Sequence, residues 1–567
     1  MSISRRYFLG SALAGSVAGV AGAAHAGEVP AKWVEPKCTG WSWEQPETPI
    51  PSSEIKETVE TDVIVIGAGL AGLCAALAAQ EAGARVTVLE KSATWGGRGC
   101  HITAFGSKLQ KKEGVDVDYA EVVRRLIAWG QGRMDERLLW QFAKKSGASF
   151  DWLADIADKH GLRPFLWEGY YKGPTYTEFP VTHIFVKKGV DLNDAKQVYG
   201  KIEDMGNIPL MNALQKEVES RNIPIRFRTP AVRILRPKEN GPVEGVIAGT
   251  KGNYTKFVAT RGVIIATGCY GSNTEMRKCY APFSLKVDEQ IYFPLKTNTG
   301  DGHQMAMRIG GVMQTVDNHA ATIHLEAGAC SYGFLHVNAL GERFKNEDVN
   351  TQSKSCTKEL QPQGGIAWTV YDSNWLDDLA EQLDNDLAGG LFFGQLYQEW
   401  GSKFNRELEQ MTQEQHIREG KVVVADTLEA LADKMGVPRE AFLKTVARYN
   451  ELAKQGKDTD FGKRSELVKP IVKGPFYAGR LRSTLLAMSG GLHTDPTLHV
   501  LDKTHRPIEK LWVAGAAAGD YFGSGDYPTI CPGMNHGRCI TFGRLAGILA
   551  AGADPDKIVA SLDIKVK

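Results

Sequence analysis

An α/β fold built around a parallel sheet is predicted by three features near the start of the chain. A short β-branched apolar run at 61–66 has the composition of a buried parallel strand. A glycine-rich turn at 67–72 follows at once, and an alanine-rich helical pattern extends to about residue 82. A second apolar run, 85–90, ends in an acid. Strand, turn, helix and strand in this order predict a βαβ unit with a nucleotide-binding turn.

Each residue of the turn has a physical role that its spacing supports. Gly67 permits the tight turn, Gly69 lets the backbone approach a pyrophosphate, and Gly72 lets the helix pack closely on the strand. The N–H groups at the helix start then face the phosphates, and Glu90 is placed to accept hydrogen bonds from an adenosine ribose. Glycines that merely form an ordinary turn are the alternative, but the strand, the helix and the spaced acid indicate a dinucleotide site.

Length, charge and cysteine spacing narrow the classes of protein that the chain can be. With 567 residues and 43% hydrophobic content, the chain is too long for one compact core, so two lobes are expected. A net charge of +1 gives no reason to expect nucleic acid or an anionic membrane surface as a partner. The nine cysteines form no CxxC pair, so no metal site is expected, with a cluster built from distant cysteines as the alternative.

The first residues have the pattern of an export signal. Arg5 and Arg6 precede a small-residue apolar stretch at 10–24, and Ala24-His25-Ala26 is a suitable cleavage site. Residues 1–26 are therefore predicted to be a twin-arginine signal peptide, the alternative being a tail with two chance arginines. The stretch is too short for an integral membrane span, and the route leads to the periplasm or the outer face of the cytoplasmic membrane. Residues 27–57, rich in proline and tryptophan, predict an extended arm.

Three later segments decide between NAD and FAD as the nucleotide. A buried strand at 261–268 ends in Ala-Thr-Gly, the sequence Thr-Gly-Asp-Gly at 299–302 opens a helix, and a strand at 510–515 leads through 532–537 into a helix that reaches Arg544. In this order the segments resemble the FAD-dependent fumarate reductase and succinate dehydrogenase flavoprotein family. That family also includes 3-ketosteroid dehydrogenases and exported alkene reductases.

The resemblance extends over residues 61–547 and includes two further motifs. Residues 341–347 are similar to the family's "GxRFxNE" turn, and 541–547 to its closing helix. The resemblance implies an α/β architecture in which a discontinuous, Rossmann-like FAD-binding domain carries an inserted α+β capping domain, with substrate held between them. The implied boundaries are 58–313 and 487–553 for the two parts of the FAD-binding domain, 314–486 for the substrate-capping domain and 554–567 for a C-terminal tail.

The same resemblance implies one bound FAD. His101 lies in the loop where some members attach FAD covalently, but its spacing to Ala104 and Gly106 does not match, so non-covalent FAD is expected. No second GxGxxG follows another strand, so electrons are expected from a separate donor such as a multihaem cytochrome. The implied FAD contacts are Gly67, Gly69, Ala71, Gly72, Glu90, Lys91, Gly97, Arg98, Gly99, Thr103, Ala104, Val232, Thr267, Gly268, Asp301, Gly533, Asn535 and His536.

The sequence departs from the family where fumarate reductases bind and protonate fumarate. The arginine that donates the proton in those enzymes corresponds to Thr351, and a histidine that binds the substrate carboxylate corresponds to Ala487. The substrate arginine of "GANRLGGNA" is also missing from the stretch 527–533. Because carboxylate recognition depends on such cationic side chains, we predict that fumarate is not the substrate.

A different set of groups replaces them near the C-terminal turn. The family's ketosteroid enzymes polarise a ketone there with a tyrosine and a backbone N–H. Tyr527 is the candidate for that tyrosine and the Gly533 amide for the second donor, and the alternative is a structural tyrosine that supports the turn. The candidates for protonating the substrate's α-carbon are His319, Tyr332, His324 and His536.

The sequence as a whole predicts an exported FAD-dependent reductase of an activated C=C bond, in an α,β-unsaturated carbonyl compound or an enoate other than fumarate. Two alternatives stay open. One is a ketosteroid-type FAD dehydrogenase, a desaturase that runs in the oxidative direction with the same residues. The other is a flavin-binding electron-relay protein without catalysis.

Overall fold

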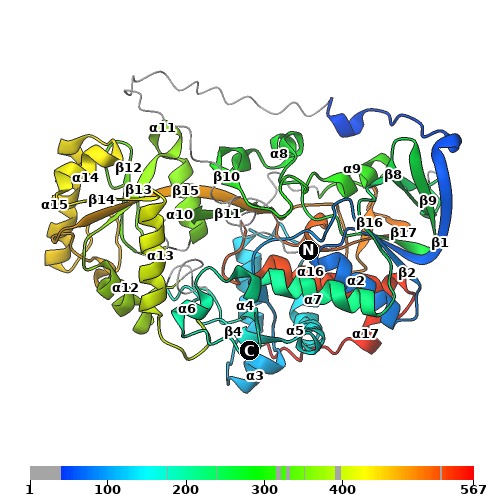
Figure 1. Cartoon of the computed structure of the whole chain (residues 1–567), viewed down its shortest axis with the longest axis horizontal. Coiled ribbons are helices and arrows are strands. Elements are labelled where there is room, and N and C mark those ends of the chain that lie inside the picture. The colour runs from blue at the N-terminus through cyan, green and yellow to red at the C-terminus, as the bar shows by residue number, and fades with distance from the viewer. Residues whose placement is uncertain are drawn as a thin grey trace.

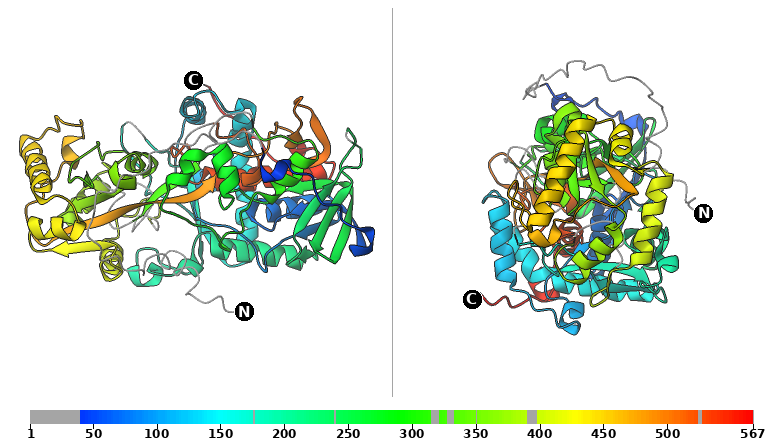
Figure 2. Two further views of the ribbon diagram at one scale, coloured as in Figure 1. Left: turned by 90° about the horizontal axis from the view of Figure 1, so that it is seen from above. Right: turned by 90° about the vertical axis from the view of Figure 1, so that its left-hand side faces the viewer.

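The structure is a computed structural model with two lobes along its longest axis (Figure 1). It describes residues 40–174, 177–238, 240–314, 321–326, 333–349, 351–389, 398–523 and 527–566. One lobe contains α2, α5, α7 and α16 with the strands around β1, and the other contains α12 to α15. The long strand β15 (Phe476–Met488) runs between the two lobes, as two further views show (Figure 2).

The larger lobe is built on an eight-stranded sheet in the order β16-β17-β9-β1-β2-β6, with β7 and β8 attached through β9. Val63 of β1 lies opposite Val86 of β2 and Gly262 of β9, and both pairings are parallel. The predicted βαβ unit is therefore present. The strands are β1 (Ile55–Ile66), β2 (Val86–Leu89), β6 (Ile225–Arg226), β7 (Ala231–Leu235), β8 (Gly245–Thr250), β9 (Asn253–Ile265), β16 (His499–Leu501) and β17 (Pro507–Val513).

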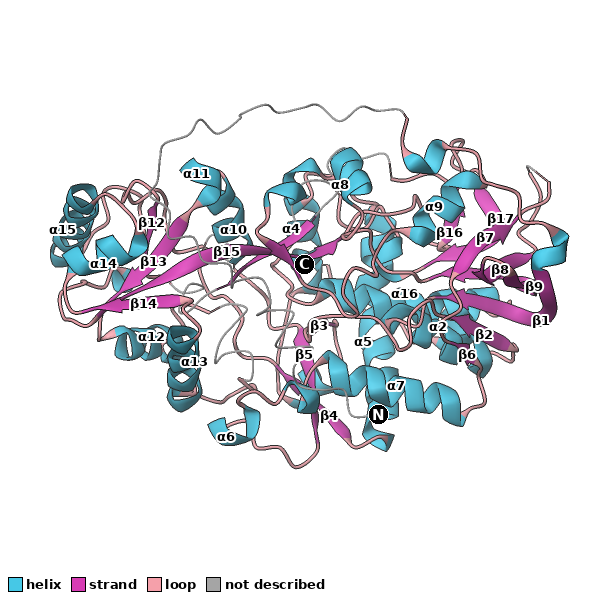
Figure 3. Cartoon of the chain, turned by 45° about the horizontal axis from the view of Figure 1, so that its top comes forward, coloured by secondary structure: helices cyan, strands magenta, loops and turns pink. Residues whose placement is uncertain are grey.

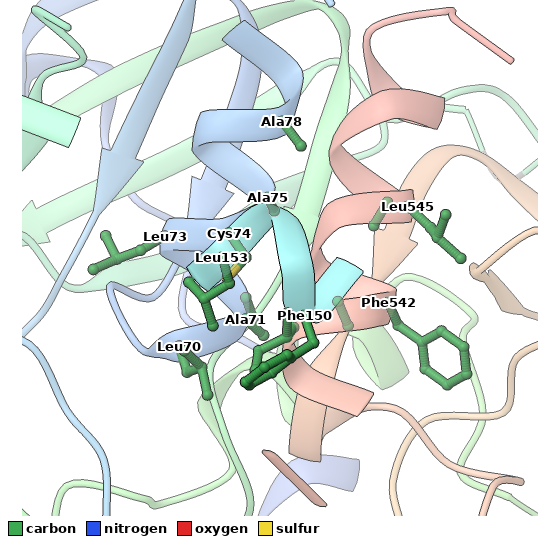
Figure 4. Packing of buried hydrophobic residues seen from close by; sticks show 14 of the residues in the cluster. Leu70, Ala71, Leu73, Cys74, Ala75, Ala78, Phe150, Leu153, Phe542 and Leu545 are labelled. Atoms are coloured by element: carbon green, nitrogen blue, oxygen red, sulfur yellow. The ribbon is translucent and has the colours of Figure 1, made fainter. Parts of the chain in front are cut away.

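Two helices from opposite ends of the chain pack side by side on this sheet. α2 (Leu70–Glu81) is buried from Leu70 to Ala79, because its small and apolar side chains leave no polar face. α16 (Met534–Ala550) approaches it so closely that a Cβ on Gly547 would lie 2.3 Å from the carbonyl oxygen of Ala75. Phe150 of α5 (Glu136–Lys159) and Phe542 of α16 add to the same core (Figure 4). This packing fixes the position of the first turn of α16, which lines the candidate active site.

The smaller lobe is built mainly from residues of the range predicted for the cap, and its sheet has the order β10-β15-β13-β12, with β11 and β14 paired to β15. α14 and α15 lie on one face of these strands and α12 on the other (Figure 3). Their apolar side chains form a separate core cluster on each face. β10 comes from the range assigned to the FAD-binding domain. The elements are β10 (Glu289–Gln290), β11 (Ala321–Glu326), β12 (Leu335–Asn338), β13 (Ala367–Tyr371), β14 (Val422–Ala425), α10 (Thr351–Glu359), α11 (Pro362–Gly365), α12 (Trp375–Asp384), α13 (Arg406–Arg418), α14 (Leu428–Met435) and α15 (Arg439–Gln455).

A three-stranded sheet in the order β3-β5-β4 lies with its helices beside the larger lobe. β3 pairs with β5, Thr103 opposite Thr182, and the backbone N–H of Thr103 donates a hydrogen bond to the carbonyl of Gly533, over 3.2 Å. The remaining elements are β3 (Ile102–Thr103), β4 (Leu162–Leu166), β5 (Thr182–Lys187), α3 (Lys108–Lys112), α4 (Tyr119–Trp129), α6 (Ala195–Val198), α7 (Asn207–Ser220), α8 (Thr274–Tyr280), α9 (Asp301–Arg308) and α17 (Pro555–Ile558).

The described part of the N-terminal arm lies on the larger lobe. The rings of Trp41 and Trp43 stack with centroids 5.3 Å apart, and Trp43 stacks on Tyr280 at 5.8 Å. These two tryptophans therefore anchor the described part of the arm. Within the residues that the structure describes, no helix combines the length and the apolar character that a membrane span requires.

Candidate active site

The glycine-rich turn after β1 brings three backbone segments together. Gly67 has a φ of +106°, and a Cβ there would lie 2.5 Å from the carbonyl oxygen of Ala266 at the end of β9. A Cβ on Gly72 would lie 1.9 Å from the carbonyl oxygen of Gly67. Both positions therefore require glycine. Gly69 is less crowded: its Cβ would lie 3.3 Å from the carbonyl oxygen of Gly96, so a ligand can approach the backbone there.

The acid at the end of β2 is held against this turn. The carboxylate of Glu90 accepts hydrogen bonds from the backbone N–H of Ala68, over 2.9 Å, and of Ser92, over 2.7 Å. No described side chain caps the start of α2, so its first N–H groups are available to an anion. The phosphate-binding and ribose-binding groups that the sequence predicts therefore lie together.

The start of α9 closes the same region from the other side. Lys91 Nζ pairs with Asp301 Oδ2 at 2.6 Å and donates a hydrogen bond to Thr299 Oγ1 over 2.7 Å. The hydroxyl of Thr267 is buried and has no hydrogen-bond partner among the described residues. A buried polar atom of this kind is costly unless a ligand satisfies it.

These groups line one cavity with about 1000 Å³ of empty space, part of which opens to solvent. The lining fits FAD and would hold it through four features. They are the glycine-rich turn, the uncapped helix start, the positioned carboxylate of Glu90 and the unsatisfied hydroxyl of Thr267. Twelve of the predicted FAD contacts line the cavity: Gly67, Gly69, Ala71, Glu90, Lys91, Gly97, Arg98, Thr267, Gly268, Asp301, Asn535 and His536.

A smaller cavity with about 450 Å³ of empty space adjoins the first. Arg98, Asn535 and His536 line both cavities, whereas Glu90 lines only the larger one. Because Glu90 marks the adenosine end, the shared wall is where the reactive ring of FAD would lie. The smaller cavity, also lined by Tyr527, is therefore the place for a substrate.

Tyr527 lines that smaller cavity. Its side chain is 4% exposed, and its phenolic oxygen accepts a hydrogen bond from the backbone N–H of Asn535 over 3.0 Å. Burial raises the pKa of Tyr527 well above its usual value, so the phenol stays protonated at neutral pH. Gly533, with a φ of +92°, precedes α16 and lines the same cavity. The structure thus brings together the two donors that the sequence predicts.

His536 and His101 form another part of the wall. His536 Nδ1 donates a hydrogen bond to the carbonyl oxygen of His101 over 2.7 Å, so the proton is on Nδ1 because a carbonyl only accepts. Burial lowers the pKa of His536, which favours the neutral ring. A Cβ on Gly99 would lie 2.8 Å from His536 Cε1, so glycine makes room for it. The ring of His101 packs edge-on against Trp167, with centroids 4.6 Å apart.

Six predicted FAD contacts lie outside the lining of the larger cavity: Gly72, Gly99, Thr103, Ala104, Val232 and Gly533. Gly99 and Gly533 line the smaller cavity instead. Thr103 Oγ1 donates a hydrogen bond to the carbonyl oxygen of Pro532 over 2.8 Å, and the N–H of Ala104 donates to the carbonyl of Val181 over 3.0 Å. The first contact holds the turn before α16 in place, and the second joins the segment after β3 to the residue before β5. Val232 follows Ala231, the residue of β7 that lines the cavity.

Two of the three predicted catalytic residues, His319 and Tyr332, lie outside the described residues, so their role stays a prediction. Thr322 of β11, the strand that follows His319 in the chain, lies opposite Ala487 of β15. Ala487 lines the smaller cavity. The backbone register therefore brings β11 to the edge of the site.

Several lining residues were missed by reasoning from the sequence. Tyr292 lines the larger cavity, and the Arg98 guanidinium lies 4.8 Å from the centroid of its ring. Asn207 Nδ2 donates a hydrogen bond to the carbonyl oxygen of Arg98 over 3.0 Å. Neither residue belongs to a motif. Cys539 also lines the cavity, and it could have been found, because it lies four residues after Asn535 on the same helix face.

The fold and this pair of cavities define a two-lobe flavoprotein in which FAD and substrate meet at a shared wall. Comparison with known proteins agrees: residues 62–526 match the FAD binding domain family, and the chain belongs to this family. The predicted cofactor and the predicted likeness to fumarate reductase flavoproteins are confirmed. The protein is an FAD-dependent oxidoreductase.

Three similar proteins cover most of the chain. The vinyl phenol reductase of Lactiplantibacillus plantarum is 27% identical over 514 residues, 86% of this chain and 96% of that protein. The open conformation of a flavocytochrome c3 fumarate reductase is 25% identical, with a TM-score of 0.65 over 91% of this chain and 82% of that one. The 3-ketosteroid-Δ4-(5α)-dehydrogenase of Rhodococcus jostii RHA1 is 24% identical, with a TM-score of 0.65 over 89% of this chain and 99% of that one.

Proposed function

We propose that the protein is an exported reductase of an activated C=C bond, in an α,β-unsaturated carbonyl compound or an enoate other than fumarate. The observation that carries this proposal is the buried, protonated phenol of Tyr527 in a cavity that shares a wall with the FAD cavity. FAD, when bound, supplies the hydride chemistry. The likeness to a vinyl phenol reductase supports a reductase of this kind.

The protein's own groups polarise the substrate. The Tyr527 hydroxyl and the Gly533 N–H donate hydrogen bonds to the substrate's carbonyl oxygen, where negative charge develops as the β-carbon receives the hydride. A donor aimed at such an oxygen in a buried site lowers the barrier by about 3–4 kcal/mol. His319 or Tyr332 then delivers the proton to the α-carbon.

The charges in the smaller cavity argue against a dicarboxylate. Among its described lining residues Arg98 is the one permanently charged side chain, and Ala487 stands where the resemblance places a histidine of fumarate reductases. Fumarate would need a cation at each end. A single guanidinium suits a monocarboxylate or a ketone instead.

The electron donor and the location belong to the same proposal. A twin-arginine signal at 1–26 would carry the folded protein, with FAD bound, to the periplasm or the outer face of the cytoplasmic membrane. There the electrons would come from a separate redox protein such as a multihaem cytochrome. The sequence supports this donor because it carries one dinucleotide-binding turn and no second one for NAD(P)H.

A ketosteroid-type dehydrogenase, working in the oxidative direction, is the second candidate. The pairing of Tyr527 with the Gly533 amide favours it, because the same two donors would stabilise the enolate that forms when a saturated ketone loses a proton from its α-carbon. Loss of a hydride from the β-carbon to the oxidised cofactor would then give the unsaturated ketone. The resemblance to a ketosteroid dehydrogenase structure concerns only the fold and does not bear on the reaction.

Anaerobic reoxidation of the reduced holoprotein tests the proposal. The protein is reduced with a low-potential dye and mixed in separate experiments with an unsaturated ketone, an aromatic enoate and fumarate, while flavin absorbance is recorded. We expect rapid reoxidation by the ketone or the enoate and none by fumarate. Reoxidation by none of them would contradict a reductase. The dehydrogenase would be favoured if a saturated ketosteroid reduced the oxidised protein faster than the matching enone reoxidised the reduced protein.

A further inference from the structure

Arg538 is a buried cation for which the described part of the chain supplies no carboxylate partner. It lies in the second turn of α16, and its side chain is 0% exposed. Its Nε donates a hydrogen bond to Asn535 Oδ1 over 2.8 Å, and its Nη1 donates to the carbonyl oxygen of Ala518 over 3.1 Å. Nη2 has no partner, and no carboxylate pairs with the guanidinium, among the residues that the structure describes. A buried guanidinium left in this way is expensive for the fold.

The position of Arg538 relates it to the FAD cavity. Asn535, whose side chain it holds, lines both cavities, and Cys539, the next residue on the helix, lines the larger one. Ala516, two residues before the Ala518 carbonyl that Arg538 binds, also lines the larger cavity. Arg538 therefore lies directly behind the wall that separates FAD from substrate.

The surroundings of Arg538 leave its positive charge unneutralised. The guanidinium lies 4.5 Å from the ring centroid of Phe522 and 5.8 Å from that of Tyr521. Aromatic faces stabilise a cation without neutralising it. Burial lowers the pKa of Arg538, but a guanidinium stays charged at neutral pH even in a protein interior.

The charges near the cavities differ between the adenosine end and the shared wall. At the adenosine end, Lys91 is neutralised by Asp301, and the Glu90 carboxylate is held by backbone amides. At the shared wall, Arg98 is 8% exposed, and its Nη1 has no partner within the described ranges. Positive charge is thus concentrated where the flavin ring would lie.

We propose that Arg538 is a positioning residue that orients Asn535. Its positive charge, which lies behind the cavity wall to which Asn535 belongs, favours the anionic form of reduced FAD and so raises the reduction potential of the cofactor. Reduced flavin carries its negative charge at the N1–C2=O edge, and a cation or a helix start nearby stabilises that charge. The stabilisation is strong because the site is buried. This role depends on FAD alone and not on the identity of the substrate.

Potentiometry of the holoprotein and its Arg538→Met variant tests the proposal. Methionine keeps much of the volume and removes the charge. We expect the variant to keep FAD but to have a potential lower by about 30–60 mV, because each tenfold loss of stabilisation of the two-electron-reduced state corresponds to about 30 mV. The affinity of the oxidised flavin for sulfite, which forms an anionic N5 adduct, should fall about tenfold for the same reason.

Two matched variants separate charge from structure. Arg538→Lys keeps the charge, so its potential should stay near that of the parent protein. Arg544→Met removes another buried guanidinium from α16, which binds the carbonyl of Ala148 over 3.0 Å and lies over Trp152, and it should not change the potential. If Arg538→Met kept the parent potential, or if Arg538→Lys lost as much as Arg538→Met, the proposed charge effect would be wrong.

A measurement on the unaltered protein keeps the proposal testable if the methionine variant does not fold. An anionic reduced flavin takes up one proton with two electrons, so the potential should change by about 30 mV for each pH unit between pH 6 and 8. A slope about twice as large would show that the neutral form is favoured, and would overturn the proposal.

Discussion

The backbone N–H of Asn535 donates a hydrogen bond to the phenolic oxygen of Tyr527 over 3.0 Å. This contact fixes the phenolic oxygen beside the smaller cavity, which both Tyr527 and Asn535 line. The start of α16 therefore positions the phenolic oxygen of Tyr527. Because the same turn of α16 lines the FAD cavity, donor and cofactor are positioned by one element.

Replacing Tyr527 by phenylalanine should reduce turnover by about 100- to 1000-fold, the usual effect of losing one donor to a developing oxyanion. The ring remains, so FAD content should not change. Steady-state kinetics with an unsaturated ketone and the flavin absorbance of the purified variant measure the two effects.

The neighbouring Tyr521→Phe variant is the matched control. Tyr521 is also buried, but its hydroxyl has no hydrogen-bond partner among the described residues, and Tyr521 does not line the smaller cavity. Its removal should leave turnover unchanged. Equal losses in the two variants, or no loss in Tyr527→Phe, would show that Tyr527 only supports the turn.

Gly72→Ala should weaken FAD binding, because the new Cβ would lie 1.9 Å from the carbonyl oxygen of Gly67. The helix must then move away from the turn, and overpacking of this kind costs about 1–3 kcal/mol. We expect about a tenfold or larger rise in the dissociation constant for FAD, measured by titrating the apoprotein.

Gly83→Ala provides the comparison at the other end of α2. A Cβ there meets nothing within 4 Å, although the φ of +85° disfavours alanine. This variant should lose a little thermal stability and keep its affinity for FAD. Similar affinities in Gly72→Ala and the parent protein would contradict the close contact.

Glu90→Gln should raise the dissociation constant for FAD by about 10- to 100-fold, since a hydrogen bond to a charged group contributes about 1.5–3 kcal/mol. The carboxylate accepts from the N–H of Ala68 and Ser92, and the amide of glutamine would turn a donor toward one of them. Titration of the apoprotein with FAD, followed by fluorescence, measures the change.

The control for this change is Glu81→Gln on α2. Glu81 binds Arg221 and Trp152 and does not line the FAD cavity, so the affinity should stay the same. An unaltered affinity in Glu90→Gln would remove Glu90 from the ribose site.

The parts of the site that could be predicted from the sequence are those whose geometry is local. Gly67, Gly72 and Glu90 belong to one strand–turn–helix–strand unit, so their spacing alone indicates their roles. Tyr292 and Asn207 could not be predicted, because each reaches the cavity from a segment without a motif. Only the packing of distant segments brings them there.

The C-terminal part of the site shows the same limit in another form. The resemblance placed Thr103 among the FAD contacts, but Thr103 binds the carbonyl of Pro532 and so supports the start of α16. The sequence separation between these two residues is 429. No pattern within either segment specifies that contact, because the approach of α16 to β3 depends on the whole lobe.

The motif at 341–347 was predicted as a family turn, and the structure shows what it holds together. Arg343 forms two-pronged hydrogen bonds with Glu347 and with Asp458, and Lys463 Nζ lies 3.4 Å from Glu347 Oε2. The side chain of Glu347 is fully buried. Glu347→Gln should therefore destabilise the protein by about 3–5 kcal/mol, because it removes the buried carboxylate that Arg343 and Lys463 share and leaves Asp458 to compensate their charge.

Acid should weaken this network in a defined pH range. Burial alone would raise the pKa of Glu347, but Lys463 and Arg343 outweigh it and lower the pKa below that of the unfolded chain. A lowered pKa contributes stability above the unfolded value of about 4.3, and this stability is lost as the pH falls below it. Thermal unfolding of the parent holoprotein should thus shift to lower temperature between about pH 5 and pH 3, and Glu347→Gln should show a smaller shift.

Glu121→Gln, which removes a surface partner of Arg124 and Arg125, should behave as the parent does. If Glu347→Gln lost as much stability in acid as the parent, other carboxylates would be responsible for the acid sensitivity.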